Sequence, residues 1–124
     1  MIVLPRKQGQ GIVIDDRIFM TVSDIRKYDV CFEMSVPIDV LIQGSPRMFG
    51  HPGRSESGEQ LAFVEIAPCP QCLWLRVDDE VSFHDRVSVR IVECKDDHIR
   101  LGLEAVEGVS VDRKEVWDVV RRDR

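Results

Sequence analysis

The sequence predicts a mainly β protein, built as two five-stranded repeats that interlock in one chain and end in a short helix. Three observations predict this: apolar and polar residues alternate over most of the chain, one segment rich in glycine, proline and serine interrupts the alternation, and the spacing is the same on both sides of it. The chain has 124 residues, 44% of them hydrophobic and 31% charged, a balance typical of a globular protein.

Residues 1–44 form the first predicted repeat, a meander of short strands. Its apolar stripes have a period of two: Ile12 and Ile14; Ile18, Met20 and Val22; Val30, Phe32, Met34 and Val36; Val40 and Ile42. Turn-forming residues separate the stripes at 9–11, 15–17 and 26–29.

Residues 45–70 break the pattern and are expected to form a linker or long loop, with a short extra strand over 61–66. Cys69 and Cys72 have the spacing of zinc and redox sites, but the sequence lacks a second pair of ligands with matching spacing. A turn with buried thiols is the favoured interpretation. We expect neither a metal nor a cofactor, and Cys69 and Cys72 are the candidate ligands if a metal does bind.

Residues 71–124 form the second predicted repeat. Its stripes are Val87, Val89 and Ile91; Ile99, Leu101, Leu103 and Ala105; Val109 and Val111. Valines at helical spacing then predict an amphipathic helix over 114–122, with Asp112 as its N-cap.

The two repeats align without gaps, 69 positions apart, as Ile12 is from Val81. Each repeat has about 45 residues, too few to bury a good core alone. We therefore expect them to pack on each other as a monomer with internal two-fold pseudosymmetry.

Several motifs resemble the carbon storage regulator family of small bacterial post-transcriptional regulators. The opening MIVLPRKQG, followed by IVIDD at 12–16, resembles the family's M-L-I-L-T-R-R-x-G-E start, which continues to I-G-D. Residues 99–102 resemble its V-R-I-G strand, and residues 109–117 its V-x-V-H-R-E-E-I-Y junction. The two repeats together cover nearly the whole chain apart from 45–70.

The resemblance implies a fold of five strands and a helix, in which two copies exchange strands and the first strand of one lies beside the fifth strand of the other. It implies a protein that binds single-stranded GGA motifs in mRNA leaders and regulates translation. This ligand agrees with general RNA recognition, because proteins that read RNA sequence bind the unstacked bases of loops. We expect a soluble cytoplasmic protein, because no apolar run approaches the roughly 18 residues of a membrane span and residues 1–7 lack the long apolar stretch of a secretory signal. The resemblance gives no reason to expect DNA or a membrane as a partner.

The two repeats have kept different halves of the family's RNA site. The first repeat keeps Arg6 and Lys7, whereas the second repeat has Leu75 at the position of Arg6. The second repeat keeps Arg113, whereas the first repeat has Gly44 at that position. The resemblance thus implies one composite site and one inactive site. The predicted RNA-binding residues are Leu4, Arg6, Lys7, Arg100, Val111, Asp112 and Arg113.

Other features point to an alternative. Pro5 removes a backbone N–H, Asp112 stands where the family has histidine, and the net charge is −5 with no net basic segment. The alternative is a protein-interaction module that no longer binds RNA; in the family, protein antagonists bind the regulator. We do not expect an enzyme, because the sequence shows no Ser/His/Asp or Cys/His constellation.

Overall fold

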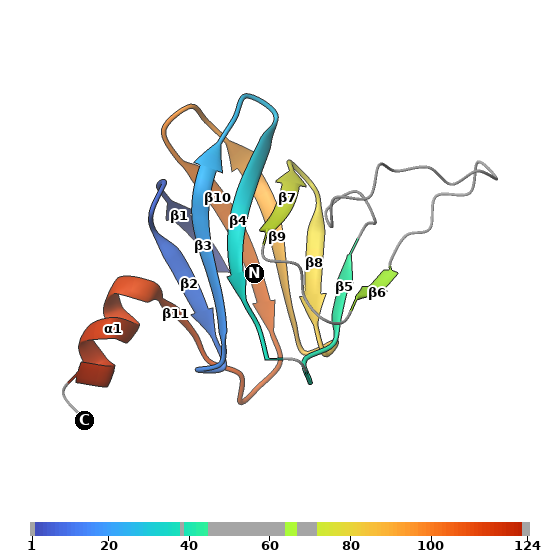
Figure 1. Ribbon diagram of the computed structural model, residues 1–124, viewed down its shortest axis with the longest axis vertical. Coiled ribbons are helices and arrows are strands. Elements are labelled where there is room, and N and C mark those ends of the chain that lie inside the picture. The colour runs from blue at the N-terminus through green and yellow to red at the C-terminus, as the bar shows by residue number, and fades with distance from the viewer. Residues whose placement is uncertain (1, 38, 45–63, 67–71, 123–124) are drawn as a thin grey trace.

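The computed structural model describes residues 2–37, 39–44, 64–66 and 72–122, which form two stacked antiparallel sheets and one helix (Figure 1). The mainly β, sandwich-like prediction is confirmed. The elements are β1 (Ile2–Arg6), β2 (Gly11–Ile14), β3 (Ile18–Ile25), β4 (Asp29–Ser35), β5 (Ile42–Gly44), β6 (Val64–Ile66), β7 (Cys72–Arg76), β8 (Glu80–Phe83), β9 (Val87–Cys94), β10 (Ile99–Ala105), β11 (Val111–Arg113) and α1 (Lys114–Arg122).

The strand order shows that the two repeats exchange strands. One sheet runs β1-β10-β9-β8-β5-β6 and the other β11-β2-β3-β4-β7. The first strand of each repeat pairs with the fourth strand of the other, β1 with β10 and β7 with β4. The fifth strands pair in the same crossed way, β11 with β2 and β5 with β8. Each sheet therefore contains strands from both repeats, as an interlocked pseudo-dimer requires.

Turns and bulges repeat at the same offset of 69 residues. The two-residue turns after β2 and β8 have positive φ angles, near 55°, at Asp15 and Asp16 and again at His84 and Asp85. Positive φ at both central residues is the hairpin geometry that matches the twist of the flanking strands. The pairing of β3 with β4 skips a residue between Val22 and Asp24, and β10 meets β9 with the same irregularity. The repeats are thus alike in backbone detail, although few residues are identical.

The core lies between the sheets, where one face of each strand is apolar. Its buried members are Ile12, Ile14, Ile18, Met20, Val22, Val30, Phe32, Val40, Ile42, Leu73, Leu75, Val81, Phe83, Val87, Val89, Ile91, Ile99, Leu101 and Leu103. Both repeats contribute to this single cluster, so burial of apolar surface couples their folding.

Helix α1 packs on the outer face of the five-stranded sheet. The Trp117 ring meets Phe19 edge to face at 5.0 Å between centroids, and its Nε1 donates a hydrogen bond of 2.9 Å to Asp16. The helix prediction is confirmed, but the predicted N-cap is wrong. Asp112 lies in β11, opposite Val13, and the helix begins at Lys114 because the strand continues through Arg113.

The predicted extra strand is confirmed over 64–66, where β6 pairs with the outer side of β5. The remainder of the predicted linker, 45–63 and 67–70, lies outside the described residues. Within the described part of the chain, no helix is long and apolar enough to span a membrane.

Candidate functional site

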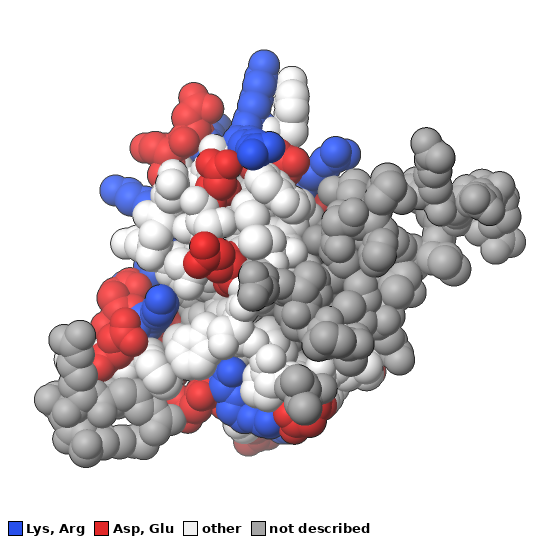
Figure 2. All heavy atoms as spheres, viewed as in Figure 1, with Lys and Arg blue, Asp and Glu red and all other residues white. Residues whose placement is uncertain are grey.

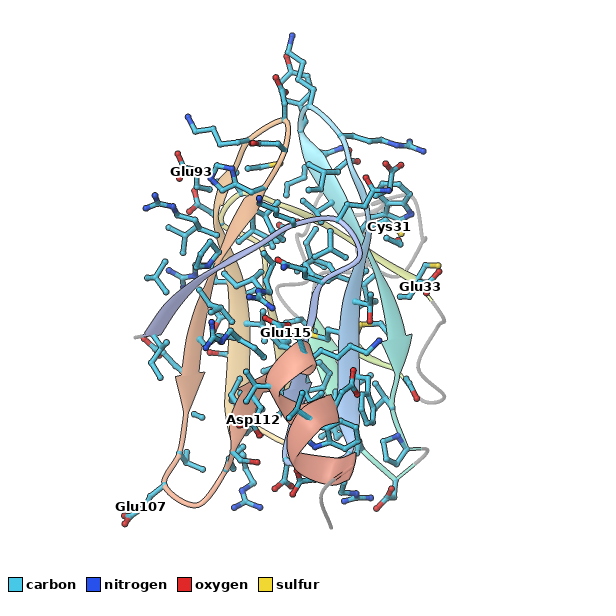
Figure 3. The ribbon with its side chains drawn as sticks, turned by 90° about the vertical axis from the view of Figure 1, so that its left-hand side faces the viewer. Cys31, Glu33, Glu93, Glu107, Asp112 and Glu115 are labelled. Atoms are coloured by element: carbon cyan, nitrogen blue, oxygen red, sulfur yellow. The ribbon has the colours of Figure 1, made fainter. Side chains whose placement is uncertain are left out.

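Two edge strands from different repeats meet on one side of the sandwich. Strand β1 ends the six-stranded sheet, and β11 ends the five-stranded sheet. Figure 3 looks onto this side, with α1 in front and Glu115 in its first turn. A direct contact joins the sheets here, because Arg6 Nη1 donates a hydrogen bond of 3.2 Å to the carbonyl oxygen of Gly11 at the start of β2. We call this side the β1–β11 edge.

Four of the predicted site residues face the gap between the two sheets. Leu4 lies opposite Leu101 and Arg6 opposite Ile99, so both share the inward face of their sheet. Val111 lies opposite Ile14 and Arg113 opposite Ile12, which places them on the inward face of the other sheet. The structure thus brings Leu4, Arg6, Val111 and Arg113 to one edge from both repeats.

The environment of Arg6 differs from that of an ordinary surface cation. Its side chain is only 5% exposed, and Glu115, at 48%, holds it with both carboxylate oxygens, 2.9 and 2.8 Å from Nη1. The Arg6 Nε donates a further bond of 2.7 Å to the carbonyl oxygen of Pro5. The hydrogen bond from Arg6 lowers the pKa of the Glu115 carboxyl below its usual value, and the nearby charges of Arg6 and Arg113 add to this.

Lys7 and Arg113 are the accessible cations of this edge. Both side chains are exposed, and neither makes a hydrogen bond or an ion pair with the described residues. Arg113 acts on the same carboxylate that Arg6 holds, so its charge lies close to that of Arg6. These two side chains are available to a ligand without breaking a hydrogen bond or an ion pair with the described residues.

Arg100 and Asp112 lie on other faces. Arg100 is opposite Pro5, on the outward face of its sheet, and its Nε lies 3.1 Å from Glu93. Asp112 is opposite Val13, on the outward face of the other sheet. Neither side chain joins Leu4, Arg6, Val111 and Arg113 at the gap between the sheets.

Sequence reasoning missed Glu115, the partner of Arg6. An acidic residue in the first turn of a helix is common because it complements the helix dipole, so by itself it gave no hint of a site. Comparison of the repeats could have found it. The positions 69 residues before Glu115 and after Arg6 are Pro46 and Leu75, so the two members of this pair are both replaced in the other copy.

The opposite edge of the sandwich is built differently. Leu75, at the position of Arg6, is completely buried in the core, and Gly44 stands where β11 has Arg113. Strand β6 pairs with β5 there, so the fifth strand of the first repeat is bordered on both sides. On the outward face of the neighbouring β7, the Arg26 guanidinium stacks 4.5 Å from the centre of the Trp74 ring.

The described cysteines do not form a metal centre. Cys31, Cys72 and Cys94 are free thiols, and the described residues contain no cluster of three or more histidine, cysteine or acidic side chains. Burial raises the pKa of the Cys31 thiol. Cys69, the other predicted candidate, lies outside the described residues.

Charged side chains do not gather into a broad basic area on the face in Figure 2, where acidic and basic groups are interspersed around the rim. This agrees with the net charge of −5. Any recognition of a polyanion therefore depends on a local group of cations, such as Lys7 and Arg113, and not on the field of the whole molecule.

Comparisons with known proteins agree with these motifs. A model of the global regulator protein family CsrA matches residues 1–45 and 72–122, the segments that contain the two repeats. No curated protein and no solved structure matches this chain. The family match covers most of the chain, in the two segments whose strands interlock. The chain therefore belongs to the CsrA family of global regulators.

Proposed function

We propose that this protein regulates translation by binding a single-stranded GGA-type motif in mRNA leaders through one composite site at the β1–β11 edge. Members of the CsrA family are non-enzymatic, RNA-binding regulators, which supports RNA as the ligand. Such a regulator works where mRNA is translated, so we place it in the cytoplasm, as a monomer that carries both repeats.

One observation carries the proposal: strand exchange brings the retained halves of both repeats to the same edge. Leu4 and Arg6 come from β1 of the first repeat, and Val111 and Arg113 from β11 of the second. All four face the gap between the sheets. If each repeat formed a sheet of its own, Leu4 and Arg6 of the first repeat would not lie beside Val111 and Arg113 of the second.

The chemistry of the edge suits an unstacked RNA loop. Leu4 and Val111 are partly buried against the core and offer apolar surface to the faces of bases. Arg113 and Lys7 offer charged donors to phosphates and base edges. Strands β1 and β11 each end a sheet, so one side of each has backbone groups that are not in a ladder, except that Pro5 has no N–H.

A single site has consequences for affinity. A regulator with two equivalent sites gains avidity when both engage one transcript, and this chain would lack that gain. Its acidic charge predicts little non-specific binding. We therefore expect weak, salt-sensitive affinity that depends on Lys7 and Arg113.

The test is titration of the full chain with a hairpin RNA that displays GGA in its loop, with a scrambled loop as the control. Arg113→Ala should weaken GGA binding by about 1–3 kcal/mol, a scale taken from paired hydrogen bonds to bases in DNA. Lys7→Ala should weaken it less and reduce its salt dependence. Arg76→Ala is the matched control, because Arg76 is also exposed and occupies the position of Lys7 at the opposite edge.

Wild-type protein that binds both loops equally, or neither, would contradict the proposal. So would an Arg76→Ala variant that loses as much affinity as Lys7→Ala. Capture of a protein partner by a chain that shows no RNA preference would favour the alternative of a protein-interaction module.

A further inference from the structure

The guanidinium of Arg6 is held by three neighbours and still keeps one donor nitrogen. Its Nε bonds to the Pro5 carbonyl oxygen, and Nη1 bonds to the Gly11 carbonyl oxygen and to the Glu115 carboxylate. Nη2 makes no hydrogen bond with the described residues, and no buried side-chain nitrogen or oxygen there lacks a partner. Nη2 therefore lies at the surface of the β1–β11 edge, although the rest of the side chain is nearly enclosed.

Glu115 has a direct connection to the second part of this edge. It stands two residues after Arg113, in the first turn of α1, so its contact with Arg6 ties the junction of β11 and α1 to β1 in the other sheet. In the sequence of the other copy, Leu75 and Pro46 stand at the two equivalent positions, so both members of the charged pair are replaced.

We propose that Glu115 is a positioning residue of the RNA site: it orients Arg6 so that Nη2 faces the ligand, and it keeps Arg113 at a fixed distance from β1. This inference rests on the proposed function. Its physical basis is that a nearly buried guanidinium requires a counter-charge, and the Glu115 carboxylate at Nη1, together with the Pro5 carbonyl oxygen at Nε, fixes its orientation. Glu115 would act through Arg6 and need not touch RNA.

The electrostatic effect of Glu115 on RNA has the opposite sign, which makes the proposal testable. A carboxylate next to the path of an RNA strand repels phosphates, so removal of its charge should strengthen binding to every RNA alike. A positioning role predicts that the same removal weakens binding to GGA loops alone. The ratio of affinities for GGA and scrambled loops separates these two effects, because uniform electrostatics cancels in it.

The experiment compares Glu115→Gln with Glu33→Gln, the same substitution at an exposed glutamate of β4, which lies opposite Cys72 in β7 and away from the β1–β11 edge. Dissociation constants for the GGA and scrambled hairpins are measured at several salt concentrations, at a temperature where circular dichroism shows each variant folded. We expect Glu33→Gln to leave the ratio unchanged and Glu115→Gln to reduce it about tenfold, the loss of one oriented contact to a base.

A second variant covers the case in which Glu115→Gln does not fold. Glu115→Asp keeps the charge but shortens the side chain by one methylene group, and it should reduce the ratio by less than Gln does. If the folded Glu115 variants keep the wild-type ratio and differ only in thermal stability, the contact is structural and the inference is overturned. If wild-type protein itself shows no preference for GGA, the proposed function fails, and this inference fails with it.

Discussion

The two lateral edges of the sandwich derive from equivalent strands but hold opposite chemistry. At the β1–β11 edge, the nearly buried Arg6 is neutralised by Glu115, and the side chains of the exposed Arg113 and Lys7 make no hydrogen bond or ion pair with the described residues. At the other edge, Leu75 fills the position of Arg6 and β6 borders the fifth strand. Because the backbones match in pairing, turns and bulges, the described difference lies in side chains, in β6 next to β5, and in α1 after β11.

This comparison shows how equivalent positions of a pseudosymmetric fold can hold either a charged pair or an apolar side chain. A buried arginine is tolerated where a carboxylate meets it, and leucine is the simpler occupant where no such partner is placed. At the second edge the position of Arg6 is therefore part of the apolar core, and only the first edge has a charged pair with a nearly buried member among the described residues. Each prediction below exchanges or removes one of these differences.

The largest effect is expected from Leu75→Arg, which places at the second edge an arginine at the position equivalent to Arg6. The Leu75 side chain is completely buried among core residues, and Gly44 and Pro46 provide no carboxylate at the positions equivalent to Arg113 and Glu115. An unpaired buried charge should lower the free energy of unfolding by about 3–5 kcal/mol. Urea denaturation followed by circular dichroism measures this; a loss below about 1 kcal/mol would mean that the second edge supplies a partner.

An intermediate effect is expected from separating Arg6 and Glu115. Arg6 is nearly buried and Glu115 is half exposed. We therefore expect a coupling free energy of about 1–2 kcal/mol, between the values for exposed and buried pairs. A double-mutant cycle with Arg6→Leu, Glu115→Gln and the double variant measures it by denaturation. Additive single effects would show that the ion pair does not hold the edge together.

The smallest effect is a pH dependence from the same pair. Because its hydrogen bond with Arg6 lowers the pKa of Glu115 in the folded state, the ionised carboxylate stabilises the fold above its unfolded pKa. That contribution is lost as pH falls through the lowered pKa of the folded state. Wild-type protein should therefore lose more stability in acid than Glu115→Gln does. Equal acid sensitivity of the two proteins would contradict this.

Sequence patterning predicted the strands, their buried faces and the internal repeat. Period-two stripes such as Ile18, Met20 and Val22 mark the core face directly, and their recurrence at Val87, Val89 and Ile91 revealed the repeat. The crossed pairing of β1 with β10 came from the family resemblance, because the alternation of a single strand does not specify its neighbour.

The details of the site were harder to predict because they depend on faces and distant contacts. Whether Arg100 points with Arg6 or away from it depends on the register between β1 and β10. The contact between Arg6 and Glu115 spans more than a hundred residues and appears only when both sheets are in place. Motif position predicted Arg6 as a ligand contact, which stays a prediction; the near burial of Arg6 and its ion pair with Glu115 became visible only in the structure.

The central claim is that RNA binds one edge of this sandwich and not the other. Titration of isotope-labelled protein with a GGA hairpin, followed by amide chemical shifts, tests it most directly. We predict saturation at one RNA per chain, with shifts concentrated in β1, β11 and the first turn of α1. Equivalent shifts in β7 and β5, or saturation at two RNAs per chain, would contradict the claim.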